Sequence, residues 1–116
     1  MVSRAFDEWV AGNPDWARPR SWGDFRAGCV AAIERVARQY GSGLSATVVS
    51  SGGVIAAICQ HLMGVPDDRV AALHWVLYNA SITRLRCSRG RITLSSFNSV
   101  THLELTGTTD SLVSYR

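Results

Sequence analysis

The sequence predicts an α/β fold, a three-layer sandwich with a small mixed sheet, and two observations carry that prediction. An amphipathic helical pattern over residues 22–40 leads into a short β-branched segment, "LSATVVSS", which is bounded by glycines. After this segment come Gly52 and Gly53, and then "VIAAICQHLM", which is apolar nearly all round. A helix, a strand buried on both faces and a second helix in this order are typical of α/β layering.

The first helix is predicted by its cap and by its apolar spacing. Ser21 followed by Asp24 resembles an N-cap with an acid three positions later. Residues 1–20, before the cap, contain aromatic side chains and prolines without a sustained period, so we expect a short helix at most there, followed by a loop. Within 22–40 the apolar residues that recur at helical spacing are Phe25, Cys29, Ile33, Val36 and Tyr40.

Glycine and proline set the limits of the next elements. Gly41 and Gly43 end the first helix, and Gly64 ends the apolar helix that follows the Gly-Gly turn. Pro66 then opens another short helix over "PDDRVAALHWVL", with acids suited to its first turn.

The last predicted element is a β hairpin. The segments "ASITRLRC" and "RITLSSF" alternate as strands do, and "SRGR" joins them as a tight turn in which Gly90 takes the unusual backbone angle. Residues 104–116 are a polar tail to which no element is assigned. Since 116 residues make one domain of ordinary size, we expect a single domain over residues 1–116.

Charge and cysteine content favour a cytoplasmic protein without a nucleic-acid or membrane partner. The formal charge of +3 comes from 12 arginines against 9 acids, and the arginines read as scattered rather than clustered. The sequence has no apolar run long enough to span a membrane. Cys29, Cys59 and Cys87 are odd in number and lie in apolar runs, so we expect reduced, buried thiols.

Four segments in register carry a family resemblance. They are "SWGDFRAGCVAAIERV" (21–36), "VVSSGGVIAAICQHLMGVP" (48–66), "NASITRL" (79–85) and "FNSVTHL" (97–103). In this order they resemble the C-terminal half of the histidine phosphatases, the family that includes the cofactor-dependent phosphoglycerate mutases. The resemblance spans about residues 21–103 and implies a truncated form of that fold, with an aromatic N-terminal segment before it and the tail after it.

Two departures from the family pattern bear on catalysis. Family members carry an Arg-His-Gly motif whose histidine takes the phosphoryl group, and the histidines here, His61, His74 and His102, are in no such motif. The family's Val-Ser-His-Gly-Gly has Ser51 in place of its histidine, and a hydroxyl carries no positive charge near neutral pH. By this resemblance, ordinary phosphohistidine catalysis is excluded unless another chain supplies the nucleophile.

The candidate ligand site is the turn of Ser51, Gly52 and Gly53. Its backbone N–H groups lie at a helix N-terminus and can bind an anion, although the glycines alone would also explain a tight turn. The resemblance adds Asn79, expected to hold loop backbone near the site or, as the alternative, to contact a ligand. His102 is the candidate base if Ser51 is a nucleophile on an elbow, but Val49 stands where that motif needs glycine.

The other residue types give fewer candidates. His61 and His74 are expected to be packing residues, no histidine or cysteine pair has metal-ligand spacing, and we expect neither a metal nor a cofactor.

The function we expect is binding of a small, anionic molecule at a strand-end pocket near Ser51, or a repurposed reaction there. The alternatives are an interaction or structural module, a subunit of a split enzyme, and a serine-dependent hydrolase that uses Ser51 and His102. A homodimer is also expected, because "LSATVVSS" lies in the sheet interior of the resembled fold beside a strand that this sequence lacks.

Overall fold

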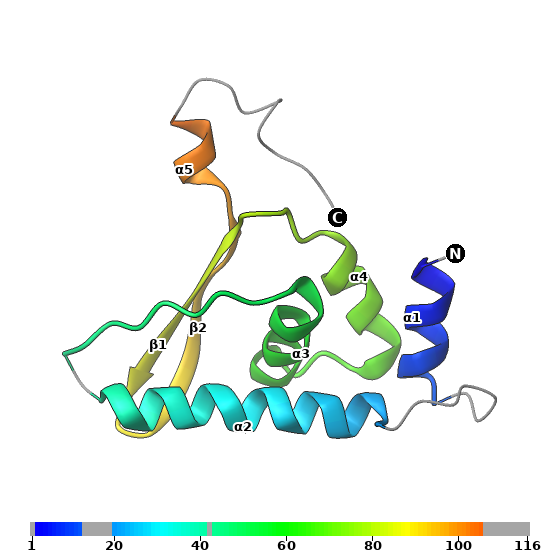
Figure 1. The fold of residues 1–116 in the computed structure, drawn as a ribbon, viewed down its shortest axis with the longest axis horizontal. Helices are drawn as coiled ribbons and strands as arrows, with labels where there is room; N and C mark the ends of the chain where they lie inside the picture. Colours follow the sequence, from blue (N-terminus) through cyan, green and yellow to red (C-terminus); the bar gives the residue numbers. More distant parts are fainter. Residues whose placement is uncertain (1, 13–19, 42, 106–116) are drawn as a thin grey trace.

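Helices and one β hairpin make up the fold in the computed structural model, which describes residues 2–12, 20–41 and 43–105 (Figure 1). The α-helices are α1 (Val2–Val10), α2 (Trp22–Tyr40), α3 (Gly52–Met63), α4 (Val70–Trp75) and α5 (Thr101–Glu104), and a 3-10 turn, η1 (Asp67–Arg69), precedes α4. The strands are β1 (Ile82–Ser88) and β2 (Arg91–Ser99). The predicted α/β class is confirmed. In the described residues, no helix has both the length and the apolar character needed to cross a membrane.

Local capping fixes α2 as the sequence predicts. The Ser21 side chain accepts a hydrogen bond from the backbone N–H of Asp24 at 3.2 Å. At the other end, the backbone N–H of Gly41 donates to the carbonyl of Ala37 at 3.1 Å, and Gly41 has a φ of 60°. A positive φ favours glycine, so the helix stops there.

The core forms where α1, α2, α3 and α4 meet. Its buried members are Trp22, Cys29, Ala56, Ala57, Val70 and Leu77. The two alanines of α3 let α2 and α4 approach closely, and α1 covers the assembly with aromatic rings. Phe6 and Trp9 meet the Trp22 ring edge-on, with ring centroids 5.2 and 5.3 Å away. Phe6 and Trp9 therefore cover the core, on a short helix as expected, whereas Trp16 lies outside the described residues.

A chain of hydrogen bonds ties three helical elements together beside this core. The indole N–H of Trp22 donates to Oε1 of Gln60 at 2.8 Å, and Nε2 of Gln60 donates to Oδ1 of Asp67 at 2.7 Å. Arg26 donates to the same carboxylate oxygen at 2.8 Å. Because Gln60 is 2% exposed, its amide must be paired to be tolerated, and the pairing fixes α2, α3 and η1 in one arrangement.

The hairpin has the tight turn that the sequence predicts. Arg89 and Gly90 lie between the paired residues Ser88 and Arg91, and both have a positive φ, 51° and 76°. This is the pattern of a type I′ turn, whose twist matches that of the strands. The register shifts on both sides of Arg84, and at each shift the extra residue lies in β2, so the irregularity is in that strand.

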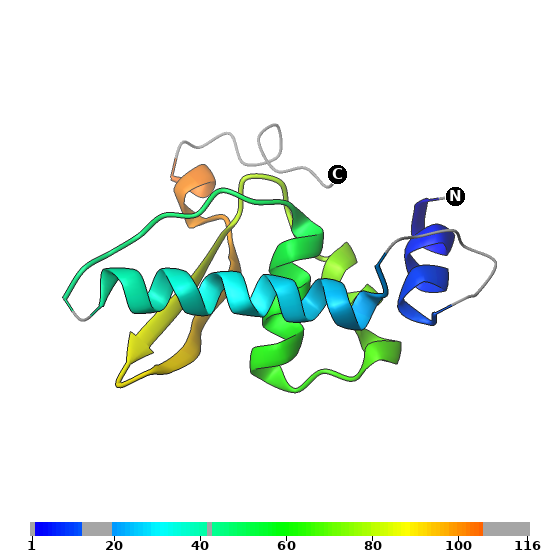
Figure 2. The ribbon, with the colours of Figure 1, turned by 60° about the horizontal axis from the view of Figure 1, so that its bottom comes forward.

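The segment before Ser51 differs from the prediction. Residues 43–50 are all exposed and belong to no strand, and the sheet of the described residues is the antiparallel pair β1–β2 rather than a mixed sheet. The prediction of a buried strand is wrong, because in the described parts of the chain no neighbouring strand offers hydrogen bonds to this segment or covers its side chains. Figure 2 shows this segment as an extended trace that returns from the end of α2 to the start of α3.

The cysteines agree with the prediction in part. Cys29 and Cys59 are buried and free, as expected, whereas Cys87 in β1 is free and exposed. Cys87 is exposed because its strand belongs to an isolated two-stranded ribbon, which leaves the end near the turn uncovered.

Candidate functional site

Ser51 ends the extended segment and caps α3. Its backbone is extended, with φ −89° and ψ 162°, and its hydroxyl makes no capping hydrogen bond. The first helical bond runs from the N–H of Ile55 to the Ser51 carbonyl at 3.1 Å, so the amides of Gly52, Gly53 and Val54 have no acceptor within the helix. Together with the positive end of the helix dipole, these donors favour an anion at this turn.

An aromatic cluster borders the first turn of α3. A Cβ placed on Gly53 would lie 4.0 Å from Nε2 of His74, a residue of α4 that is 8% exposed. Phe6 of α1 stacks on the imidazole with ring centroids 4.4 Å apart and planes at 18°, and Trp75 meets it edge-on at 4.7 Å. The packing role expected for His74 is confirmed. Its position beside Gly53 has no local sequence signal, because three elements far apart in the chain create it.

The other predicted site residues lie on different elements. Asn79 is exposed in the turn between α4 and β1. His102 is exposed on α5, which in both views of the fold lies beyond the end of the hairpin, away from the start of α3 (Figures 1 and 2). Among the described residues, no hydrogen bond or ring contact joins His102 to Ser51. The structure thus brings Ser51, Gly52 and Gly53 together and adds His74, but it does not bring His102 to them.

Asn98, at the end of β2, is a structural residue that the sequence analysis did not single out. Its Oδ1 accepts a hydrogen bond from the backbone N–H of Tyr78 at 2.8 Å, and its Nδ2 donates to the carbonyl of Val76 at 2.7 Å. Its own backbone N–H donates to Oγ1 of Thr83 at 3.2 Å, and its φ is 57°. Asn98 therefore holds the loop that carries Asn79. The one feature of the sequence that could have identified Asn98 is its place in "FNSVTHL", a segment that carries the family resemblance.

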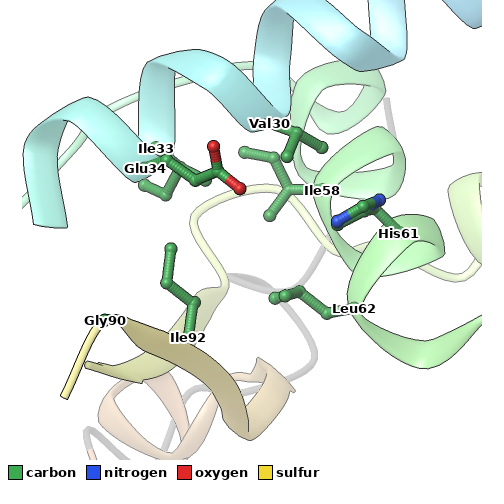
Figure 3. Close-up of a pocket in the computed structure, with 8 residues that line it drawn as sticks. All are labelled: Val30, Ile33, Glu34, Ile58, His61, Leu62, Gly90 and Ile92. Carbon is green, nitrogen blue, oxygen red and sulfur yellow. The ribbon is translucent and has the colours of Figure 1, made fainter. Parts of the chain in front are cut away.

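A small cavity lies at the opposite end of α3 from Ser51 (Figure 3). Its volume is about 160 Å³. The residues that line it are Val30, Ile33, Glu34, Ile58, His61, Leu62, Gly90 and Ile92. His61 is exposed at its edge rather than packed in the core, because it faces outward near the last turn of α3. The lining combines aliphatic side chains with polar surface that includes Glu34 and His61, and the cavity is a gap in the packing between α2, α3 and the hairpin.

The buried cysteines are poor nucleophiles. Burial raises the pKa of Cys59 to about 11. Burial also raises the pKa of Cys29, although the positive charge of Arg20 partly counteracts this rise. Because the thiolate is the reactive form, neither cysteine is set up for nucleophilic chemistry near neutral pH.

Comparison with known families gives one result. The model of the histidine phosphatase superfamily (branch 1) matches residues 2–100. The match therefore reaches beyond the segments that carry the sequence resemblance and includes the N-terminal aromatic helix. Comparisons with curated proteins and with solved structures gave no match.

Proposed function

Because the chain belongs to the histidine phosphatase superfamily (branch 1), we propose that it binds a small anionic molecule at the turn of Ser51, Gly52 and Gly53 without ordinary phosphohistidine catalysis. The observation that supports this proposal most is the start of α3. A helix of 12 residues begins there with an unused serine hydroxyl and three backbone amides that lack helical acceptors.

The absence of phosphohistidine catalysis rests on the residues available at this turn. No histidine of the chain follows an arginine and precedes a glycine, and by the family resemblance Ser51 stands where members have their second histidine. His74 is the imidazole that borders Gly53, but it is 8% exposed and Phe6 stacks against its face. A nucleophile must reach the phosphorus atom, and a buried, stacked ring has little freedom to do so.

Binding at this turn is expected to be weak and to depend on the hydroxyl. Ser51 can donate one hydrogen bond to an anion, and the backbone amides supply the others. Loss of a hydrogen bond to a charged group costs about 1.5–3 kcal/mol. Ser51→Ala is therefore expected to weaken phosphate binding by roughly 10- to 100-fold.

The experiment is a titration with inorganic phosphate at millimolar concentration, followed by the amide NMR shifts of the glycines. Gly52 and Gly53 should shift, the thermal midpoint should rise, and Ser51→Ala should reduce both effects. Gly64, an exposed glycine at the C-terminal end of α3, serves as the internal control for non-specific ionic effects. Unchanged shifts of Gly52 and Gly53 together with an unchanged midpoint would contradict the proposal and leave the interaction-module alternative.

Activity assays separate the proposal from the catalytic alternatives. Purified protein should not hydrolyse p-nitrophenyl phosphate, and a fluorophosphonate should not label Ser51. Turnover that survives purification and is lost in Ser51→Ala would overturn the proposal. Labelling of Ser51 that is lost in His102→Ala would instead favour the serine-dependent hydrolase.

We further propose that the chain works as a homodimer in which residues 44–50 of two copies pair as strands. No hydrogen bond joins these residues to the rest of the described chain, and Val49 is 95% exposed. The segment carries no charge, so an antiparallel pair of two copies brings no like charges together. Because the segment ends at Ser50, directly before Ser51, pairing would also fix the position of the chain where it enters α3.

A further inference from the structure

The hairpin carries a local excess of positive charge. Four of the 12 arginines and none of the 9 acids lie in residues 82–99, so the hairpin carries +4 while the whole chain carries +3. The other eight arginines and nine acids leave the rest of the chain at −1. The excess positive charge of the molecule is therefore confined to β1, β2 and their turn. These arginines are Arg84, Arg86, Arg89 and Arg91.

The strand register places three of these arginines on one face. Arg84 and Arg86 are two residues apart on β1, and successive side chains of a strand alternate between faces. Ser88 continues that face and pairs with Arg91 of β2. The inner face carries the half-buried Leu85, Ile92 and Leu94, whereas all three arginines of the outer face are exposed.

The fourth arginine extends this face at the turn. Arg89 is exposed and has a φ of 51°, a left-handed conformation that an asparagine in a type I′ turn adopts more easily. Like charges on one face of a sheet also repel each other. Both features cost stability, and an anion that neutralises the face relieves the repulsion.

These guanidinium groups have no acidic partner within the described part of the chain. The ion pairs there are Arg4–Glu8 and Arg26–Asp67, neither of which involves the hairpin. Glu34 lines the cavity beside Gly90, on the inner side of the hairpin, and forms no ion pair with an arginine. The outer face is thus available for a ligand with several negative charges.

We propose that this arginine face, formed by Arg84, Arg86, Arg89 and Arg91, binds the phosphate backbone of duplex DNA. A two-stranded β ribbon fits the major groove of B-form DNA, which is wide enough to admit it, whereas the major groove of duplex RNA is too narrow. The face holds serine and threonine between the arginines and no aromatic ring for stacking on bases, which favours a duplex over a single strand.

The recognition is of the backbone and not of the base sequence. Arginine, serine and threonine side chains are the common donors to phosphate oxygens. Neutralising about four phosphates should give a slope of log K against log salt of about −3.6, or roughly a 150-fold loss of affinity between about 50 and 200 mM salt.

The test uses fluorescence anisotropy with a mixed-sequence DNA duplex of about two helical turns. The variant Arg84→Gln/Arg86→Gln should reduce the slope to about −1.8, which is roughly a 12-fold loss over the same salt range. The matched control is Arg35→Gln/Arg38→Gln on α2, since both arginines are exposed and the net charge changes equally. The control should keep the slope of the unchanged protein. Circular dichroism confirms the fold of both variants.

Three outcomes would overturn the proposal. The first is an equal effect of the two double variants, because binding would then follow net charge alone. The second is tighter binding of the single strand than of the duplex. The third is preferential, arginine-dependent binding to vesicles of phosphatidylcholine and phosphatidylserine, which would identify a membrane surface as the partner.

Discussion

Residues 44–50 and the β1–β2 hairpin are both rich in strand-forming residues, yet only the hairpin forms a ladder. The two strands of the hairpin are joined by a two-residue turn and pair with each other, whereas the segment 44–50 lies between two helices and has no adjacent strand among the described residues. The difference shows that β propensity describes a fit to a neighbour rather than an intrinsic state of the chain. In the homodimer that we propose, the segment 44–50 becomes a strand by pairing with its second copy.

The largest expected effect on assembly comes from breaking this partnership at Thr47. Thr47→Pro removes one backbone donor from each copy of the proposed dimer, and each lost hydrogen bond costs about 0.5–1.5 kcal/mol. The dimer dissociation constant should rise on the order of 10- to 100-fold, as measured by sedimentation at low micromolar concentration. Thr47→Val keeps the N–H and should leave assembly intact. A stable, well-folded monomer of the unchanged protein would refute the dimer.

A second change tests how the hairpin is held to the rest of the fold. Asn98→Ala removes two side-chain hydrogen bonds and places alanine at a φ of 57°, so the free energy of unfolding should fall by about 2–4 kcal/mol. Asn98→Gly removes the same bonds but tolerates this φ, so chemical denaturation should show a loss about 1–2 kcal/mol smaller. Equal losses in the two variants would exclude a contribution from backbone conformation.

The smallest expected effect comes from Arg89→Asn in the hairpin turn, which should stabilise the fold and weaken DNA binding. Arg89→Asn places the preferred residue at the left-handed position and should raise the free energy of unfolding by about 0.5–1 kcal/mol. The same change removes one charge from the arginine face, so the salt slope for DNA should become less steep by about 0.9. The control is Arg89→Gln, which removes the charge but lacks the preference of asparagine for the left-handed position of the turn. A loss of stability in Arg89→Asn would contradict the account of this turn.

The sequence predicts those elements whose determinants are local. The ends of α2 follow from Ser21 and Gly41, and the hairpin follows from strand alternation around Gly90. The burial of 44–50 was mispredicted, because burial depends on a neighbour that lies outside the segment. The arginines illustrate the same limit, since Arg86 and Arg91 come to one face only when the strands pair.

The residues of the candidate site are likewise predictable from the sequence only where their determinants are local. Ser51 and its glycines are predictable, because a strand-like run followed by Gly-Gly and an apolar helix places a helix N-terminus there. His74 beside Gly53 and Asn98 across from Tyr78 arise from contacts between distant elements, and no periodicity or cap in their own segments indicates them.

Amide hydrogen exchange of residues 44–50, measured at increasing protein concentration, tests most directly whether this segment is a strand that awaits a second copy. The hairpin amides that donate to the opposite strand should be protected at every concentration. Amides of residues 44–50 should exchange freely in dilute solution and become protected as the dimer forms. Exchange of residues 44–50 that stays fast at concentrations where the protein is fully associated would contradict the account.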